Sequence, residues 1–401
     1  MRISLERNAL TYKKGRGDES LRIVFAGGGT GGHLMAGVAT AEEIRSRFPK
    51  AGISFFGTGN PVERRCLQGR GFGFFSVMGT GWKGSITNAV MFFGGLVVSL
   101  FSCLLTLKEL KPDVVFGLGG YSSLAPVIGA AVLRVPVIIL EQNVMPGKAN
   151  RLLSRFADLV LCHWPSSSTS ECFGDIKRLH FTGTPLRKGL LDNEKAKAAA
   201  LFKLSPDRTT ILVLGGSQGA SAINRAVTWC LPELMERRRD IQLIHCTGSE
   251  DYLQVKDAYE TNGVEARVYE FLDEMGAAYS MADLAVSRAG ATTLAELTAR
   301  GIPAVLVPYP YGTDDHQHMN ALELSKKGAA VLLEERFLTP KRLSMVFSEL
   351  LGDKERLNRM GLISKSMGRP RAAQAVVDIT LRLLEKKKSG KICQDLSLQT
   401  T

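Results

Sequence analysis

Residues 21–40, LRIVFAGGGTGGHLMAGVAT, are the stretch that decides the fold of this chain. A short apolar run at 23–26 meets a cluster of glycines and then a helical pattern, which predicts a strand, a tight turn and a helix. Gly27, Gly29 and Gly32 satisfy the spacing G-x-G-x-x-G. In such a turn the missing side chains let backbone N–H groups approach a phosphate at the positive end of the helix. The stretch therefore predicts an anion-binding turn.

The second strand of this unit argues against a dinucleotide ligand. A dinucleotide-binding unit adds an acidic residue about 20 positions further on, where it holds the ribose hydroxyls. Here the second strand, residues 53–60, reads ISFFGTGN and contains no acidic residue. The sequence therefore disfavours NAD.

Composition sets the class of protein. With 401 residues, of which 45% are hydrophobic and 22% charged, the chain is long enough for two soluble domains with full cores. The seven cysteines form no C-x-x-C pair and no metal-ligand spacing with histidine, so we expect reduced thiols. Residues 1–20 contain no continuous apolar region of a secretory signal, so we expect a disordered extension and a protein that stays in the cytoplasm.

The positive charge is concentrated in the first half of the chain. Lys and Arg outnumber Asp and Glu by 17 to 9 in residues 21–187, whereas residues 188–366 have 22 against 24. Nucleic acid or an anionic membrane surface would both explain this asymmetry. Because we find no zinc finger, helix-turn-helix or basic motif with interleaved aromatic residues, we expect no nucleic-acid partner.

An uncharged segment inside this basic half indicates contact with a membrane. Residues 84–107, GSITNAVMFFGGLVVSLFSCLLTL, are long enough for a transmembrane helix. A single crossing would put the strands at 53–56 and 114–117 on opposite sides of a membrane, although they must join one sheet. We therefore expect a helix that packs on the sheet and offers an apolar edge to the bilayer. A crossover helix buried against the sheet is the alternative.

A second glycine turn follows in residues 112–124, PDVVFGLGGYSSL. It could be only a tight turn from strand to helix. Two such turns on one sheet would nevertheless place two anion-binding helix ends at the same carboxyl edge, where open α/β sheets bind ligands. After the next strand, Pro146 starts a predicted helix with Lys148, Arg151 and Arg155 on one face, and Leu152 and Phe156 on the other. A solvated basic face and a contact with lipid phosphate both remain open.

The second half of the chain repeats this plan. Residues 211–220, ILVLGGSQGA, read as a buried strand that ends in glycines. Further strands are predicted at 241–246, 268–271, 284–287 and 304–307, each separated by a helical segment. Because strand and helix alternate throughout, we predict two α/β domains with parallel sheets.

Residues 283–308 predict the binding site of a diphosphate. A strand ends at Ser287, small residues follow, and a helix runs from about Thr293 to Ala299, which leaves free N–H groups at its start. Glu296 lies three residues after Thr293, the spacing of a capping box that would close the helix end on itself. The alternative is a carboxylate that accepts from both ribose hydroxyls. Spacing alone does not separate the two.

The next loop contains side chains that suit either a metal or a sugar. These are Asp314, Asp315, His316, Gln317, His318 and Asn320. Two histidines with two aspartates suggest a metal site, whereas hydrogen-bond donors and acceptors would also suit sugar hydroxyls. Since a helix N-terminus already supplies the charge that a leaving diphosphate needs, we expect no metal.

Together the motifs resemble the MurG family of peptidoglycan glycosyltransferases, in glycosyltransferase family 28. They are GGGTGGH at 27–33, GLGGYSS at 117–123, EQN at 141–143, GTPLR at 183–187, GGSQGA at 215–220, and RAGATTLAE at 288–296 with the downstream DHQ-x-x-NA. The resemblance implies a GT-B fold, in which two Rossmann-like domains with parallel sheets face a central cleft. It assigns residues 21–187 and a C-terminal helix at about 368–386 to a domain for the lipid acceptor, and 188–367 to a domain for UDP-N-acetylglucosamine. The tail at 387–401 lies outside the pattern, and we expect it to be disordered.

The resemblance also implies the reaction and its residues. The family transfers N-acetylglucosamine from UDP-N-acetylglucosamine to the C4 hydroxyl of lipid I, which forms lipid II. The family's donor contacts fall on Thr30, Gly31, Gly32, Asn143, Arg187, Ser217, Leu272, Ala291, Thr292, Thr293, Leu294, Ala295, Glu296 and Gln317. Gly119, Gly120, Tyr121 and Ser122 would form the loop for the acceptor. His33 is the first candidate for the base, because a helix N-terminus disfavours its protonated form; its alternative role is a helix-start residue bonded to the backbone.

The implied reaction inverts the sugar linkage and uses neither a metal nor a cofactor. Its partners would be UDP-N-acetylglucosamine, lipid I, the anionic surface of the inner membrane at its cytoplasmic face, and cell-wall synthesis proteins. This chain has Leu140 where many members of the family have a histidine before EQN, so any role of that histidine is absent here. A nucleotide-sugar epimerase and an inactive scaffold that binds UDP-sugar are the rival interpretations.

Overall fold

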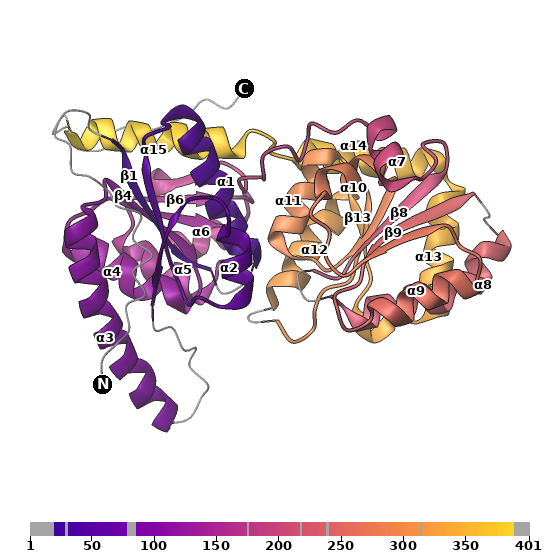
Figure 1. Ribbon diagram of the computed structural model, residues 1–401, viewed down its shortest axis with the longest axis horizontal. Helices are drawn as coiled ribbons and strands as arrows, with labels where there is room; N and C mark the ends of the chain where they lie inside the picture. Colours follow the sequence, from indigo (N-terminus) through magenta and orange to yellow (C-terminus); the bar gives the residue numbers. More distant parts are fainter. Residues whose placement is uncertain are drawn as a thin grey trace.

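The computed structural model describes residues 20–28, 31–77, 86–174, 176–216, 219–237, 240–312 and 315–388. It contains two α/β domains side by side, each built on a parallel sheet (Figure 1). The fold class predicted from the alternation of strands and helices is therefore confirmed.

The first domain is built on a seven-stranded sheet in the order β3-β2-β1-β4-β5-β6-β7. Its strands are β1 (Arg22–Gly27), β2 (Gly52–Gly57), β3 (Gly73–Ser76), β4 (Val114–Gly119), β5 (Val137–Glu141), β6 (Leu159–Cys162) and β7 (Leu179–Phe181). All neighbouring strands are parallel. Strand β3 was not predicted from the sequence, because it lies at the sheet edge with mostly exposed side chains and has no buried apolar run.

Helices cover both faces of this sheet. They are α1 (Gly31–Arg47), α2 (Pro61–Leu67), α3 (Ile86–Leu110), α4 (Leu124–Val132), α5 (Lys148–Leu153) and α6 (Ser167–Phe173), with 3₁₀ turns at Tyr121–Ser123, Ser154–Phe156 and Ile176–Arg178. Along β1, Ile23 and Phe25 pack under α1, whereas Val24 and Ala26 face α3 and α4. This burial on both faces explains why the strand is a continuous apolar run without alternation.

Helix α3 packs on α4 and reaches the sheet, as the sequence predicts. Cys103 and Leu107 belong to the core between these helices and the strands. A Cβ on Gly129 of α4 would lie 3.3 Å from Leu107, so the two helices approach closely. Figure 1 shows the N-terminal part of α3 extending beyond the sheet. Of the helices in the described part of the chain, none has the length and hydropathy to cross a membrane.

The basic helix predicted after Pro146 is shorter than expected. Helix α5 ends at Leu153 and continues only as one 3₁₀ turn, because the chain must then enter β6 beside β5. Leu152 and Phe156 are 47% and 45% exposed, while Leu153 is buried in the core.

The second domain has a six-stranded parallel sheet in the order β10-β9-β8-β11-β12-β13. Its strands are β8 (Thr209–Leu214), β9 (Ile241–Cys246), β10 (Ala266–Tyr269), β11 (Leu284–Ser287), β12 (Ala304–Leu306) and β13 (Ala330–Leu332). Its helices are α7 (Lys195–Phe202), α8 (Ser221–Arg237), α9 (Tyr252–Thr261), α10 (Met275–Met281), α11 (Ala291–Arg300), α12 (His316–Lys327), α13 (Pro340–Gly352) and α14 (Lys354–Met367), with a 3₁₀ turn at Glu335–Phe337.

The last helix, α15 (Ala372–Lys388), returns to the first domain and lies along α1 (Figure 1). Val376 and Leu383 join the core beneath α1, and Asp378 pairs with Arg47. The crossing passes close to the segment after β7: Gly183 has φ +86°, and a Cβ there would lie 2.3 Å from the Cβ of Arg369. Only glycine fits at this point of the domain connection.

Candidate functional site

The two glycine turns of the first domain lie side by side at the carboxyl edge of its sheet. Gly27 and Gly119 are register partners of β1 and β4, and both have positive φ. A Cβ on Gly27 would lie 2.3 Å from the carbonyl oxygen of Gly119, so no larger residue fits. At the second turn, the Ser123 hydroxyl donates to the Gly120 carbonyl at 2.7 Å. The prediction that the two turns lie at the same edge of the sheet is therefore confirmed.

The same edge faces the second domain, where α1 and α2 lie opposite α11 and α12 (Figure 1). The Thr292 hydroxyl, in the first turn of α11, donates to the carbonyl of Gly32 at 2.9 Å. It also lies 3.4 Å from Oε1 of Gln142, whose Nε2 is 3.4 Å from the carbonyl of His33. The N-termini of α1 and α11 therefore meet where the domains meet, and each helix presents its positive end there.

His33 is the third residue of α1 and is partly buried at this junction. Burial lowers the pKa of His33; the carboxylate of Glu141 opposes this effect, and His316 of the second domain adds to it. A neutral imidazole at this position can accept a proton.

Glu141 fixes the loop that follows β5. Its Oε1 accepts from the backbone N–H groups of Gln142 and Asn143, both at 2.9 Å. Its Oε2 accepts from the Gly147 N–H at 3.0 Å and from Nδ2 of Asn150 at 2.9 Å. A buried carboxylate that is satisfied in this way is a structural anchor, so the first residue of EQN holds the loop in shape.

Asn143 connects this loop to the second domain. Its Oδ1 accepts from Nδ2 of Asn320 at 3.1 Å, and Oδ1 of Asn320 accepts from the Val144 N–H at 2.9 Å. Asn320 is fully buried on α12, where it also donates to the carbonyl of Ala289 at 3.2 Å. Asn320 belongs to the downstream motif of the sequence, but its pairing with Asn143 was not predictable from that motif.

Glu296 is 4% exposed and belongs to a cluster with Arg187 and Tyr279. Its Oε1 accepts from Nε and Nη2 of Arg187 at 3.1 and 3.0 Å, and its Oε2 accepts from the Tyr279 hydroxyl at 2.7 Å. The capping-box alternative is wrong: α11 begins at Ala291 with Gly290 as N-cap, and no side chain caps it. Sequence analysis missed Tyr279, because a tyrosine in a short helix carries no motif.

Further residues predicted to contact the sugar donor lie in α11 and α12. Leu294 and Ala295 are buried in the core, and Thr293 follows Thr292 in the first turn. Gln317 links two loops, since its Oε1 accepts from the N–H groups of Ala289 at 3.2 Å and Tyr309 at 3.0 Å.

Other predicted positions lie around this cluster or outside the described residues. Leu272 is buried in the loop after β10. In the loop predicted to hold the acceptor, Tyr121 is exposed and Ser122 is buried. Leu140, in place of the family histidine, is buried in the core of the first domain. Thr30 and Ser217 lie outside the described residues.

The loop that suggested a metal shows no such cluster in its described part. Asp314 lies outside the described residues, and His316 begins α12. Within the described ranges, no group of three or more His, Cys, Asp or Glu side chains is arranged to hold a metal ion. The six described cysteines are free thiols.

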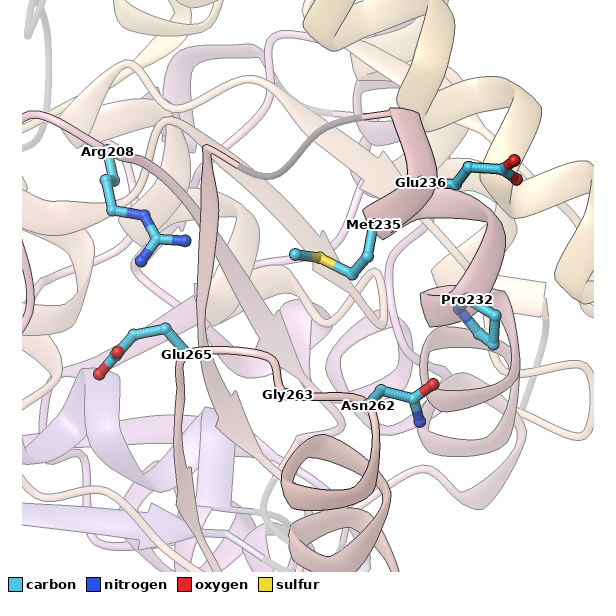
Figure 2. Close-up of a pocket in the computed structure, with 7 residues that line it drawn as sticks. All are labelled: Arg208, Pro232, Met235, Glu236, Asn262, Gly263 and Glu265. Carbon is cyan, nitrogen blue, oxygen red and sulfur yellow. The ribbon is translucent and has the colours of Figure 1, made fainter.

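A surface pocket with a volume of about 560 Å³ lies away from the domain junction, at the amino ends of the second sheet (Figure 2). It is lined by Arg208, Pro232, Met235, Glu236, Asn262, Gly263 and Glu265. No predicted site residue lines this pocket. The candidate site is therefore the junction of the two carboxyl edges, where parallel sheets bind ligands.

Comparisons with known proteins match both domains. The model of the glycosyltransferase family 28 N-terminal domain matches residues 23–162, and that of the C-terminal domain matches residues 210–376. The UDP-N-acetylglucosamine–N-acetylmuramyl-(pentapeptide) pyrophosphoryl-undecaprenol N-acetylglucosamine transferase of Thermodesulfovibrio yellowstonii is 40% identical and covers 92% of this chain and 100% of that protein.

Among solved structures, Acinetobacter baumannii MurG has 27% identity and a TM-score of 0.71, and covers 90% of this chain and 99% of that chain. A UDP-GlcNAc 2-epimerase from Neisseria meningitidis, at 13% identity and a TM-score of 0.65, covers 90% of this chain and 100% of its own. At this low identity, the similarity to the epimerase shows a shared fold and nothing more.

Proposed function

Because the chain belongs to glycosyltransferase family 28, we propose that it transfers N-acetylglucosamine from UDP-N-acetylglucosamine to the C4 hydroxyl of the N-acetylmuramic acid in lipid I, which forms lipid II. The relative from Thermodesulfovibrio yellowstonii, matched over its whole length, is named as an N-acetylglucosamine transferase of N-acetylmuramyl-(pentapeptide) pyrophosphoryl-undecaprenol. The observation that carries the proposal is the bond of 2.9 Å from Thr292 to the Gly32 carbonyl, since it brings the start of α11 to the first turn of α1, where His33 lies.

In this proposal the donor binds to the second domain. Its diphosphate lies at the N-terminus of α11, where the N–H groups of Ala291, Thr292 and Thr293 have no partner in the preceding turn of the helix. The ribose hydroxyls donate to Glu296, whose carboxylate is oriented by its two protein partners. The backbone of Leu272 holds the uracil.

His33 acts as the base on the acceptor. The C4 hydroxyl gives its proton to the neutral imidazole as its oxygen attacks C1 of the sugar. The bond from C1 to the diphosphate breaks on the opposite face, and UDP leaves with that electron pair. The helix N-terminus stabilises the negative charge of the leaving group, so the step needs no metal to supply that charge. One in-line displacement inverts an α-linked donor into a β-linked product.

Replacement of the base provides a direct test of this assignment. His33→Gln keeps a polar side chain but removes a group that takes up a proton, so we expect kcat to fall by about 10²- to 10⁴-fold. The KM for the donor should stay within about threefold, since His33 is not part of the proposed nucleotide contacts. Full turnover by the variant would remove His33 as the base and leave the transferase intact.

We further propose that the first domain rests on the anionic surface of the membrane, at its cytoplasmic face, through the outer face of α3. Val97, Val98, Phe101 and Leu105 follow helical spacing on this face, and Val97 and Phe101 are 67% and 65% exposed. Further exposed apolar side chains are Val132 on α4, which packs against α3, and Leu152 on α5, which packs against α4. Exposed apolar side chains in a basic domain suit a surface of anionic lipid.

Vesicle binding tests this surface. Phe101→Ser with Val97→Ser should reduce binding to vesicles that contain phosphatidylglycerol by about tenfold or more, since each change removes an apolar side chain from the bilayer. Leu253→Ser on α9 of the second domain is the matched control, because Leu253 is 77% exposed but lies outside the surface. Equal binding by the wild type, the double variant and the control would exclude α3 as the contact.

Product analysis tests the transferase itself. Purified protein is given labelled UDP-N-acetylglucosamine and a short-chain lipid I analogue in EDTA. A labelled disaccharide lipid is expected. Release of N-acetylmannosamine from the donor alone would indicate an epimerase instead. Donor binding without product, both in EDTA and with magnesium, would indicate a scaffold that binds UDP-sugar.

A further inference from the structure

The buried carboxylate of Glu63 in α2, which the proposed reaction does not use, holds the loop before this helix and packs against the first glycine turn. Asn60 caps α2 by accepting from the Glu63 N–H at 2.9 Å. Oε2 of Glu63 accepts from the Gly59 N–H at 2.7 Å and from the Thr58 hydroxyl at 3.1 Å. A Cβ on Gly28 would lie 2.9 Å from Oε1 of Glu63, so the carboxylate packs directly against the turn. The start of α2 is therefore held by its own loop, beside the glycine turn.

This orientation sends one side chain of α2 across to the second domain. The Arg65 guanidinium lies over the ring of Phe271, 5.2 Å from its centroid. Phe271 is 43% exposed and directly precedes Leu272 in the loop after β10. The neighbouring Arg64 turns the other way, because its Nε donates to the Gly59 carbonyl at 2.8 Å. Arg65 is thus a first-domain residue placed beside the proposed nucleotide loop.

A second observation puts Arg65 close to the ribose end of the same site. The Cys66 thiol lies within electrostatic range of both Arg65 and Arg187. Arg187 is bonded to Glu296, the proposed ribose acceptor. The last turn of α2, the Arg187 cluster and the Phe271 loop therefore lie close together at the domain junction.

We propose that Arg65 is a specificity-determining residue for the donor, which closes over the nucleoside of UDP together with Phe271. This inference deepens the proposed function and rests on it. A planar guanidinium can stack on an aromatic ring and on a nucleobase, and its charge attracts the anionic nucleotide. Because Arg65 belongs to the acceptor domain, the contact forms only when the two domains are together. Arg65 would then add a contact from α2 to the first-domain donor contacts at the glycine turn and Asn143 that the family resemblance implies.

The test measures the Kd of UDP by calorimetry. Arg65→Ala is expected to weaken UDP binding about three- to tenfold, which is the range of one partly exposed cation–π contact. Arg65→Lys should give an intermediate loss, because it keeps the charge and loses the planar stack. The control Arg64→Ala, on the same helix, should stay within about twofold of the wild type, as should the melting temperature of every variant.

Two further measurements separate this role from general support of the fold. The Kd of UMP should rise by the same factor as that of UDP, because the contact lies at the nucleoside. Phe271→Leu combined with Arg65→Ala should lose less than the sum of the single losses, since the two side chains act as one unit.

The possible results distinguish the role of Arg65 from the transferase function on which this role rests. A Kd of Arg65→Ala within about twofold of the wild type, or a loss for UDP but not for UMP, would overturn the role of Arg65 and leave the transferase standing. A wild-type protein that does not bind UDP would overturn both.

Discussion

Acid is expected to destabilise the second domain through His245, a buried histidine in β9 that takes no part in the proposed reaction. His245 is 0% exposed. Its Nε2 lies 3.0 Å from Oδ1 of Asn224, and its Nδ1 lies 2.9 Å from the Tyr259 hydroxyl. Asn224 uses its Nδ2 to donate to the Thr247 carbonyl at 2.9 Å, so its oxygen faces the histidine as an acceptor. The proton therefore lies on Nε2, and Nδ1 accepts from the tyrosine.

Burial lowers the pKa of His245 to about 3, far below its ordinary value. The unfolded chain takes up a proton near pH 6.5, while the folded domain stays neutral until about pH 3. The contribution of neutral His245 to the unfolding free energy is therefore complete above the pKa of this residue in the unfolded chain. It is lost as the pH falls below that value. Between about pH 7.5 and pH 5.0 this one group should remove about 2 kcal/mol of unfolding free energy.

Urea denaturation followed by circular dichroism at the two pH values measures this loss. His245→Gln cannot take up the proton, so its unfolding free energy should fall by about 2 kcal/mol less than that of the wild type between the same pH values. At neutral pH the variant should be less stable by about 1–3 kcal/mol, because buried hydrogen bonds are lost. Buried His163, whose pKa is also about 3, contributes equally to both proteins. Identical acid losses in wild type and variant would refute the reasoning.

Three further substitutions test the junction and the domain connection. Thr292→Val keeps the shape but loses the hydrogen bond to the first turn of α1, so kcat/KM in the transfer assay should fall about three- to tenfold. Glu296→Gln removes the charge that orients the proposed ribose contact, so the calorimetric Kd of UDP should rise about tenfold. Gly183→Ala puts a Cβ 2.3 Å from that of Arg369 and should lower the unfolding free energy by about 2–4 kcal/mol in urea. Its control is Gly189→Ala, at a glycine that also has a positive φ, +80°, but where a Cβ would meet nothing within 4 Å; this variant should lose only about 1–2 kcal/mol.

Local sequence was enough to predict the parts of the fold that depend on local chemistry. The apolar runs of β1 and β4 end in glycines that the turns require, so both turns and the shared carboxyl edge were predictable. The helix near Thr293 was also predicted, although it begins two residues earlier, at Ala291. Short or exposed strands such as β3 were not, because too few of their side chains are buried to leave a pattern.

The partners of the site residues depend on distances that a sequence does not contain. Thr292 bonds to a residue 260 positions away, and Glu296 to one 109 positions away. The spacing of Glu296 from Thr293 fits a capping box, yet the buried carboxylate is used by Arg187 and by Tyr279 of the neighbouring helix. In a buried site an ion pair and a hydroxyl satisfy a carboxylate that a local cap would leave partly unpaired.

Local sequence therefore predicted two parallel α/β domains and the glycine turns, because periodicity and glycine content act within a few positions of the chain, whereas the family resemblance supplied the candidate residues. Only the tertiary structure decided how those residues combine. It joins Thr292 to Gly32 and Asn143 to Asn320, and it brings Arg65 over Phe271. The physical reason is that each of these contacts forms between the two domains, where packing of whole sheets and helices sets the positions of the side chains.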